Sequence, residues 1–278
     1  MRLADCDPGD CAHVKRPEAA LDFEKILDER LPERQELLYA AACNSVLIVL
    51  QGLDTAGKDG TIKHVMSRLN PAGVRVDSFK APTHHELAHD FLWRAHNVAP
   101  ATGWIEIFNR SHYEDVPVTR VENLVPKETW KARFEQINSF ERILVANGTI
   151  VLKFFLYISK EEQRARLLAR ERDESKAWKL SRTDWVTFEK YDEYIEAYEE
   201  ALEKCTSDDA PWYIVPSNHK WFRNLAVAQT ISDTLESYEH VWRQKLRERG
   251  ERILKELSDQ RRGEEPARPR RDRVLDDA

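Results

Sequence analysis

The chain is organised around one stretch, Gln51-Gly52-Leu53-Asp54-Thr55-Ala56-Gly57-Lys58-Asp59-Gly60-Thr61. Residues 45–50 just before it read Ser-Val-Leu-Ile-Val-Leu, an apolar run typical of a strand buried on both faces of a parallel sheet. Residues 57–69 carry apolar side chains at helical spacing. Between a strand and a helix, a glycine-rich turn lets backbone N–H groups and the helix N-terminus face an anion. The stretch therefore predicts a phosphate-binding loop; the plainer alternative is an ordinary strand-to-helix turn with an exposed lysine.

Two acidic residues distinguish this loop from the usual nucleotide-binding version. The position after Lys58, where a Ser or Thr hydroxyl normally binds Mg²⁺, is occupied by Asp59. Asp54 places a second carboxylate inside the loop, where a negative charge beside a polyanion is costly unless a metal cation lies between them. Asp54 is therefore our first candidate for a Mg²⁺ ligand, or for the group that orients a phosphoryl acceptor.

Bulk composition excludes several classes of protein. The 278 residues are 41% hydrophobic and 33% charged, which fits a globular chain with a sizeable core. The net charge of −6 argues against general nucleic-acid binding. No apolar run approaches the roughly 20 residues of a membrane span, and the first residues lack the apolar core of a signal peptide. The four cysteines show neither a metal spacing nor a disulfide framework. We expect a cytoplasmic protein.

Strands alternate with helices along the chain. Apolar runs predict strands at residues 45–50, 74–79, 104–108, 149–158 and 212–216. Helical spacing predicts helices at residues 17–42, 57–69, 84–97, 127–146, 160–172, 185–205 and from about 221 onward. This order indicates an α/β fold with a parallel sheet. We expect an irregular tail at residues 1–17, one domain at 18–258 with a lid at about 160–184, and a charged, disordered tail at 259–278.

Ligands of such sheets bind beyond the carboxyl ends of the strands. That edge brings together the loops at residues 52–58, 80–83 and 109–115. Asn109 stands where phosphate-loop enzymes carry a metal-binding Walker-B carboxylate. The next residue, Arg110, is suited to grip a phosphate with two hydrogen bonds, and the alternative for it is a surface ion pair. For His112, a packing role is favoured over catalysis.

A second basic cluster follows the predicted strand at 149–158. Arg164, Arg166, Arg170, Arg172, Lys176, Lys179 and Arg182 alternate there with acidic residues. By itself such a run is most simply a solvated helix face. In a phosphate-loop kinase, a basic segment at this place forms the lid over the transferring phosphoryl group.

Taken together, these motifs resemble the type-2 polyphosphate kinases. The resemblance rests on Gly52-Leu53-Asp54-Thr55-Ala56-Gly57-Lys58-Asp59-Gly60, Phe79-Lys80-Ala81-Pro82-Thr83, Phe91-Leu92-Trp93-Arg94, Phe108-Asn109-Arg110-Ser111-His112-Tyr113-Glu114 and Trp178-Lys179-Leu180-Ser181. It covers about residues 23–242, and the Asn-Arg-Ser-His-Tyr-Glu version resembles class III, which phosphorylates both AMP and ADP. It implies a thymidylate-kinase-like P-loop kinase fold, an αβα sandwich of three layers with a helical lid.

The resemblance also implies an activity and its partners. The activity is reversible transfer of the terminal phosphoryl group of inorganic polyphosphate to AMP or ADP with Mg²⁺, in a homo-oligomer of two or four subunits. Adenine nucleotides are the expected acceptors, with guanine nucleotides left open. Neither nucleic acid nor membrane is an expected partner.

Carried over position by position, the resemblance assigns the site residues. The catalytic set is Asp54, Lys58, Arg110 and Arg170. The phosphate-binding set is Gly52, Thr55, Ala56, Gly57, Lys58, Asp59, Gly60, Lys80, Arg110 and Lys176. The metal set is Asp54, Asn109 and Glu114. One departure concerns the lid, because Arg182 stands where the family usually has proline after Leu-Ser.

Two rival functions remain open on the sequence. One is an ATP-dependent nucleoside monophosphate kinase on the same fold, and the other is a phosphate-loop module that binds or regulates without catalysis. Asp54 argues against both, because neither needs a carboxylate inside the loop.

Overall fold

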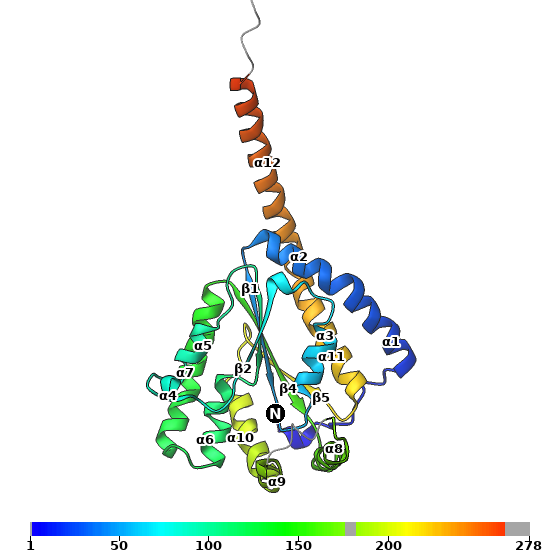
Figure 1. The fold of residues 1–278 in the computed structure, drawn as a ribbon, viewed down its shortest axis with the longest axis vertical. Coiled ribbons are helices and arrows are strands. Elements are labelled where there is room, and N and C mark those ends of the chain that lie inside the picture. Colours follow the sequence, from blue (N-terminus) through cyan, green and yellow to red (C-terminus); the bar gives the residue numbers. More distant parts are fainter. Residues whose placement is uncertain (1, 176–181, 265–278) are drawn as a thin grey trace, which may run out of the picture.

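A computed structural model of the chain describes residues 2–175 and 182–264. Its centre is a parallel sheet of five strands in the order β2-β3-β1-β4-β5 (Figure 1). The strands are β1 (Ser45–Gln51), β2 (Val74–Ser78), β3 (Ile105–Asn109), β4 (Thr149–Tyr157) and β5 (Trp212–Pro216). The central strand β1 is buried along its whole length, as its unbroken apolar sequence predicts.

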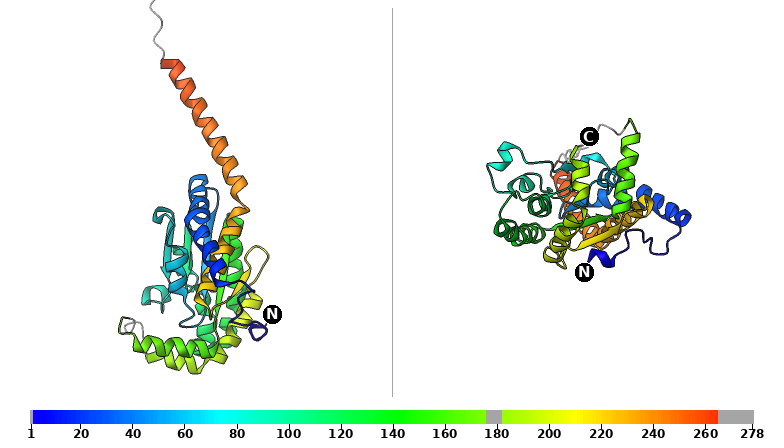
Figure 2. Two further views of the ribbon diagram at one scale, coloured as in Figure 1. Left: turned by 90° about the vertical axis from the view of Figure 1, so that its right-hand side faces the viewer. Right: turned by 90° about the horizontal axis from the view of Figure 1, so that it is seen from below.

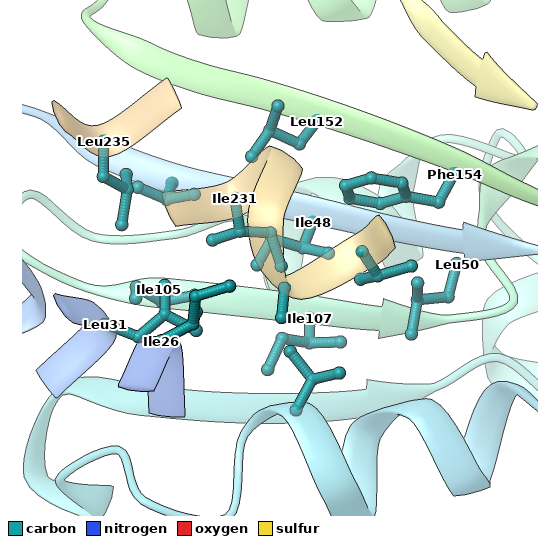
Figure 3. Packing of buried hydrophobic residues seen from close by; sticks show 14 of the residues in the cluster. Ile26, Leu31, Ile48, Leu50, Ile105, Ile107, Leu152, Phe154, Ile231 and Leu235 are labelled. Atoms are coloured by element: carbon teal, nitrogen blue, oxygen red, sulfur yellow. The ribbon is translucent and has the colours of Figure 1, made fainter. Parts of the chain in front are cut away.

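Helices cover both faces of the sheet because successive side chains of β1 point to opposite sides. Val46, Ile48 and Leu50 join one core, and Leu47 and Val49 join the other. The first core is closed by α1 (Arg16–Lys25), the π-helical turn η2 (Ile26–Arg30), α2 (Leu31–Ala41), α3 (Lys58–Val65) and α11 (Lys220–Glu236), and Figure 3 shows part of it. The second is closed by α5 (Trp93–Asn97), α7 (Lys127–Ala146) and α10 (Tyr191–Lys204). The predicted three-layer αβα sandwich is confirmed.

The two edges of the sheet carry different elements. At the carboxyl edge lie α8 (Lys160–Arg172), which falls in the expected lid, and α9 (Arg182–Glu189), which begins where that lid was expected to end (Figure 1). α12 (Glu239–Glu264) leaves the body at the opposite edge (Figure 2). Five short segments complete the described part: η1 (Leu3–Asp5), η3 (Pro71–Gly73), α4 (His84–Leu87), η4 (His112–Asp115) and α6 (Pro117–Val121).

Several stretches differ from the sequence expectation. The helix expected at residues 57–69 ends at Val65, and the helix expected from about residue 221 onward is divided into α11 and α12. The helix expected at residues 84–97 is two short helices, α4 and α5, separated by a turn in which Asp90 Oδ1 accepts a hydrogen bond from the Leu92 N–H at 3.0 Å. The helix expected at 185–205 is divided at Lys190 into α9 and α10. Residues 259–264, expected to be disordered, continue α12 as helix. In the described ranges no helix is both long and apolar enough to cross a membrane.

Candidate active site

Backbone geometry makes the loop after β1 dependent on two glycines. Gly52 has φ +145°, and a Cβ atom there would lie 2.6 Å from the Leu156 carbonyl oxygen. Gly57 has φ +106°, and a Cβ atom there would lie 1.8 Å from Nη1 of Arg223. Both positive φ values belong to a region that side-chain-bearing residues rarely adopt. The glycines of the motif are therefore required by the turn itself and by the close approach of an arginine.

Lys58, the first residue of α3, turns its ammonium back over the loop. Its Nζ donates to the carbonyl oxygens of Gly52 at 2.6 Å and Leu53 at 3.1 Å. Burial, helped by the nearby positive charge of Arg110, lowers the pKa of Lys58 to about 8. A phosphate group placed at the loop would supply the negative charge that this buried ammonium needs.

Arg110 lies between two carboxylates. Its guanidinium forms ion pairs with Asp54 of the loop and with Glu114, the latter at 2.9 Å. Burial by itself would raise the pKa of Asp54, but the charges of Arg110 and Lys58 outweigh it and hold this pKa below its usual value. Asp54 is thus ionised, and the two acids fix the direction of the arginine side chain.

Asn109 is the last residue of β3 and faces the loop. Its Nδ2 donates to Asp59 Oδ1 at 2.9 Å, so the unusual acid after Lys58 meets the unusual amide at the Walker-B position. Because Asn109 pairs in register with Leu50 of β1, the two strands deliver both residues to one place. The side-chain oxygen of Asn109 and the carboxylate of Asp54 are both hard donors of the kind that Mg²⁺ prefers.

Two arginines that sequence analysis did not assign to the site support the loop from behind. Arg166 on α8 donates to the carbonyl oxygens of Thr55 at 2.9 Å and Ala56 at 3.2 Å. Arg223 on α11 donates to the same Ala56 oxygen at 3.1 Å and is almost fully buried. Burial and the charge of Arg166 lower the pKa of Arg223 to about 10. The signal for Arg223 was its place just beyond the carboxyl end of β5, the edge where ligands bind.

Most of these groups line one cavity of about 870 Å³. Its lining includes the basic residues Lys58, Lys80, Arg110, Arg166, Arg170, Lys220 and Arg223, and the acidic residues Asp54 and Asp59. Arg170 contributes from α8, where its Nη1 lies 3.5 Å from Asp184 of α9. The cavity is thus strongly cationic on an acidic protein, and it is suited to a polyanion.

Most of the predicted site residues converge on this cavity. Thr55, Gly57, Asp59, Gly60, Lys80 and Asn109 line it together with Asp54, Lys58, Arg110 and Arg170. Gly52 and Ala56 shape the loop from inside it, through the carbonyl contacts with Lys58 and the two supporting arginines. Glu114 stands behind Arg110 rather than in the lining. Lys176 lies outside the described residues.

His112 has the packing role that the sequence favoured. Its ring is fully buried and packs against Phe108, Tyr113 and Phe140 with ring centroids 4.8–6.4 Å apart. Burial lowers the pKa of His112 below its usual value, so the ring is neutral. It does not line the cavity, which favours the packing role over a catalytic one.

Comparison with known proteins agrees with this geometry. The sequence model of the family described as Polyphosphate kinase 2 matches residues 20–243. The chain is similar to the AMP/ADP-polyphosphate phosphotransferase of Meiothermus ruber, with 48% identity over 85% of this chain and 89% of that protein. It is also similar to the ADP-polyphosphate phosphotransferase of Rhodopseudomonas palustris, with 45% identity over 75% of this chain and 76% of that protein.

A solved structure extends the comparison to the fold. The crystal structure of Polyphosphate Kinase 2 from Arthrobacter aurescens TC1 matches with a TM-score of 0.83 and 40% identity, over 85% of this chain and 86% of that one. The family match spans the sheet, the phosphate loop and both supporting arginines. The chain therefore belongs to the polyphosphate kinase 2 family.

Proposed function

We propose that this protein transfers the terminal phosphoryl group of inorganic polyphosphate to AMP and ADP, and catalyses the reverse reaction. One observation carries the proposal: the phosphate loop opens onto a cavity lined by seven basic side chains, and the carboxylate of Asp54 lines the same cavity. A single nucleotide tail does not need so long a basic surface, whereas a chain of phosphates does. The names of the two similar transferases support the same donor and acceptors.

In phosphoryl transfer the protein mainly aligns the donor and acceptor phosphates and neutralises charge on the group that is transferred. Lys58 and the loop N–H groups are placed to bind donor phosphates at the start of α3. Arg110 and Arg170 enter the cavity from β3 and from α8, so they can stabilise the transferring group from two sides. Asp54, held by Arg110, is placed to orient the acceptor phosphate.

Mg²⁺ is the metal that we propose for this site. The fit rests on the donor set, because Asp54 and Asn109 both line the cavity and both offer oxygen ligands. Glu114, expected in the same set, is paired with Arg110 and serves better as the support of that arginine. Within the described ranges no three His, Cys, Asp or Glu side chains form a metal-binding group, so substrate phosphates must supply further ligands. When bound, Mg²⁺ would neutralise phosphate charge and so let Asp54 lie next to a polyanion.

A direct assay tests the function. Purified protein is mixed with Mg²⁺, AMP and polyphosphate in the absence of ATP, and the nucleotides are separated by chromatography. We expect ADP and then ATP, and a Lys58→Met control without activity. Transfer only when ATP is supplied would indicate the ATP-dependent nucleoside monophosphate kinase, and no transfer under either condition would indicate a binding module. ADP that accumulates without ATP, while polyphosphate is in excess, would limit the acceptor to AMP.

The proposal also covers the location, the oligomeric state and the acceptor base of this enzyme. We expect a cytoplasmic homo-oligomer, dimer or tetramer, that uses adenine nucleotides, with guanine nucleotides as a further acceptor class to be tested. Size-exclusion chromatography with light scattering checks the oligomer, and substitution of GMP for AMP in the assay checks the base.

A further inference from the structure

The segment that carries Arg110 has a backbone that needs outside support. Arg110 has φ +60°, in the left-handed region that non-glycine residues avoid, and Ser111 follows in an extended conformation at φ −163°. Such a conformation is strained and persists only where surrounding contacts enforce it. The Arg110 N–H donates to the Leu50 carbonyl at 3.0 Å, and Gln51 bonds the Ser111 hydroxyl at 3.0 Å. These contacts hold only the start of the segment. Its other end is held by different residues.

Beneath that other end lies a buried polar network. Lys153, in the middle of β4, donates from Nζ to Glu141 Oε2 at 2.6 Å, to the Cys205 carbonyl at 2.6 Å and to the Tyr113 hydroxyl at 3.1 Å. The Tyr113 hydroxyl donates in turn to Glu141 Oε1 at 2.8 Å. The exposed fractions of Lys153, Tyr113 and Glu141 are 0%, 1% and 4%. The ion pair is thus removed from water, and every proton of the ammonium has an acceptor.

Stability alone does not explain this network. Removing two charges from water is unfavourable, and apolar residues of similar size in their place often leave a protein as stable or more stable. Phe134, Phe140 and Trp130 fill the same core, so an apolar solution was available there. The buried ion pair, unlike apolar side chains, also binds the Tyr113 hydroxyl and holds it in one position. Tyr113 is only three residues from Arg110, and Lys153 pairs in register with Val49 of the strand that leads into the phosphate loop.

We infer that Glu141 and Lys153 are positioning residues for phosphoryl transfer, which fix Arg110 opposite Asp54 by anchoring the Tyr113 hydroxyl. The network ties β4 and α7 to the end of the arginine-bearing segment, while Leu50 and Gln51 hold its start. With both ends held, Arg110 keeps its strained backbone and points into the cavity. The inference rests on the proposed function and on the role of Arg110 in it.

The first test removes one oxygen atom. Tyr113→Phe keeps the ring in its apolar surroundings and takes away only the anchored hydroxyl. We expect kcat to fall about 10-fold or more, since a small misplacement of a catalytic group is costly, with KM for AMP and polyphosphate nearly unchanged. Ser45→Ala is the matched control, because it deletes the buried hydrogen bond of 2.9 Å between Ser45 and Thr149 at the opposite edge of the sheet. We expect Ser45→Ala to retain the kcat of the parent protein.

The second test separates positioning from stability. Glu141→Leu combined with Lys153→Met removes both charges together, so neither is left unpaired in the core. We expect the urea midpoint of unfolding to stay close to that of the parent protein while kcat falls as in Tyr113→Phe. Parental kcat in both Tyr113→Phe and the double variant would overturn the inference. So would a loss of kcat that follows the loss of stability and is equally present in Ser45→Ala.

The crystal structure of Tyr113→Phe keeps this test independent of the proposed function. If the parent protein fails to transfer phosphoryl groups from polyphosphate, the proposed function fails and the structure of the variant decides the inference. Displacement of Arg110 from Asp54 supports the positioning role. An Arg110 side chain that keeps both carboxylate partners overturns it.

Discussion

Asp54 is a negative side chain in a cavity where the other long side chains are mostly positive. Its carboxylate is held by Arg110 and is ionised, and it lines the cavity in which we propose that phosphate oxygens bind. A carboxylate and a phosphate, both negative, are tolerated side by side only with a cation between them. The neighbouring Asn109 provides a neutral oxygen, a weaker ligand for a hard cation than a carboxylate. In the Mg²⁺ site that we propose, most of the negative charge would therefore come from Asp54 and from the substrate.

Asp54→Asn tests this assignment, since it keeps the shape of the side chain and removes its charge. We predict a loss of about 10²-fold or more in kcat, on the scale of several kcal/mol of charge stabilisation. Asn109→Ala should cost less, because it removes no charge. Both variants are measured across a Mg²⁺ titration. Near-normal activity of Asp54→Asn at millimolar Mg²⁺, with an inactive Asn109→Ala, would mean that the metal is assigned to the wrong residue.

A control is needed because Asp54→Asn also weakens one ion pair of Arg110. Glu114→Gln weakens the other ion pair of the same arginine, yet Glu114 does not line the cavity. If Asp54 acts through the metal, Glu114→Gln leaves the Mg²⁺ dependence of the rate unchanged. An equal shift in the Mg²⁺ requirement of both variants would show that Asp54 acts only by holding Arg110.

Single residues of the site were predictable where a motif fixes their place. Lys58, Asp59, Asn109 and Arg110 follow directly from the ends of two neighbouring strands, so the sequence brings them together. The role of Arg223 could not be read in this way. Its guanidinium reaches the Ala56 carbonyl from a residue 167 positions away, and that contact depends on how α11 packs against α3. Long side chains that bind backbone carbonyls leave no periodic signal in a sequence.

The phosphate loop and α3 form an element whose conformation depends on Gly57. An alanine there would have to adopt φ +106° and would displace the buried Arg223 guanidinium. We predict that Gly57→Ala lowers the free energy of unfolding by about 1–3 kcal/mol and weakens polyphosphate binding. Urea unfolding and a titration with polyphosphate measure the two effects.

Gly60 supplies the matched comparison inside the same element. It lies in the first turn of α3 with ordinary helical geometry, and a Cβ atom there would lie 3.3 Å from Arg223 Nη2. Alanine is the better helix former by roughly 0.8–1.0 kcal/mol. Gly60→Ala should therefore cost less stability toward urea than Gly57→Ala. Equal stability losses at the two positions would contradict the role assigned to Gly57.

Elements with one strong periodic signal were predicted closely, and divided ones were not. The helices at Lys127–Ala146 and Lys160–Arg172 and the strand at Trp212–Pro216 have the predicted bounds. The prediction of one helix at residues 84–97 was wrong because apolar residues keep helical spacing across the turn at Asp90. One of these apolar residues, Leu87, does not face the core, since it is 65% exposed. Periodicity records which side chains face a core in general, and it does not record where the backbone breaks.

The order of strands is a property of the whole molecule that periodicity leaves open. Alternation of strands and helices predicts a parallel sheet, but the order β2-β3-β1-β4-β5 depends on the lengths and directions of the crossovers. What alternation does predict is the common edge where the strands end, and that edge holds the cavity. The site was therefore predictable before the arrangement of the sheet was known.

The N-terminal segment shows the same limit at the largest scale. Residues 1–17 have no periodic pattern and read as an irregular tail, yet Leu3 is fully buried in a cluster with Leu53 of the phosphate loop, Phe155 and Tyr198. The Leu3 N–H donates to Glu199 Oε1 on α10 at 2.6 Å. Figure 1 shows this end of the chain at the carboxyl edge of the sheet, near α8 and α9. One buried leucine thus connects the first residues to the surroundings of the active site.

Leu3→Ala should consequently behave as a core substitution, although it lies at a chain end. Leucine-to-alanine changes in cores cost about 2–5 kcal/mol of unfolding free energy. Leu21→Ala on α1 is the matched control, since Leu21 is 75% exposed and should cost less than about 0.5 kcal/mol. Urea unfolding of both variants compares the two positions. A Leu3→Ala midpoint equal to that of Leu21→Ala would mean that the N-terminal segment is detached in solution, and α10 would then have to keep its place over β4 without it.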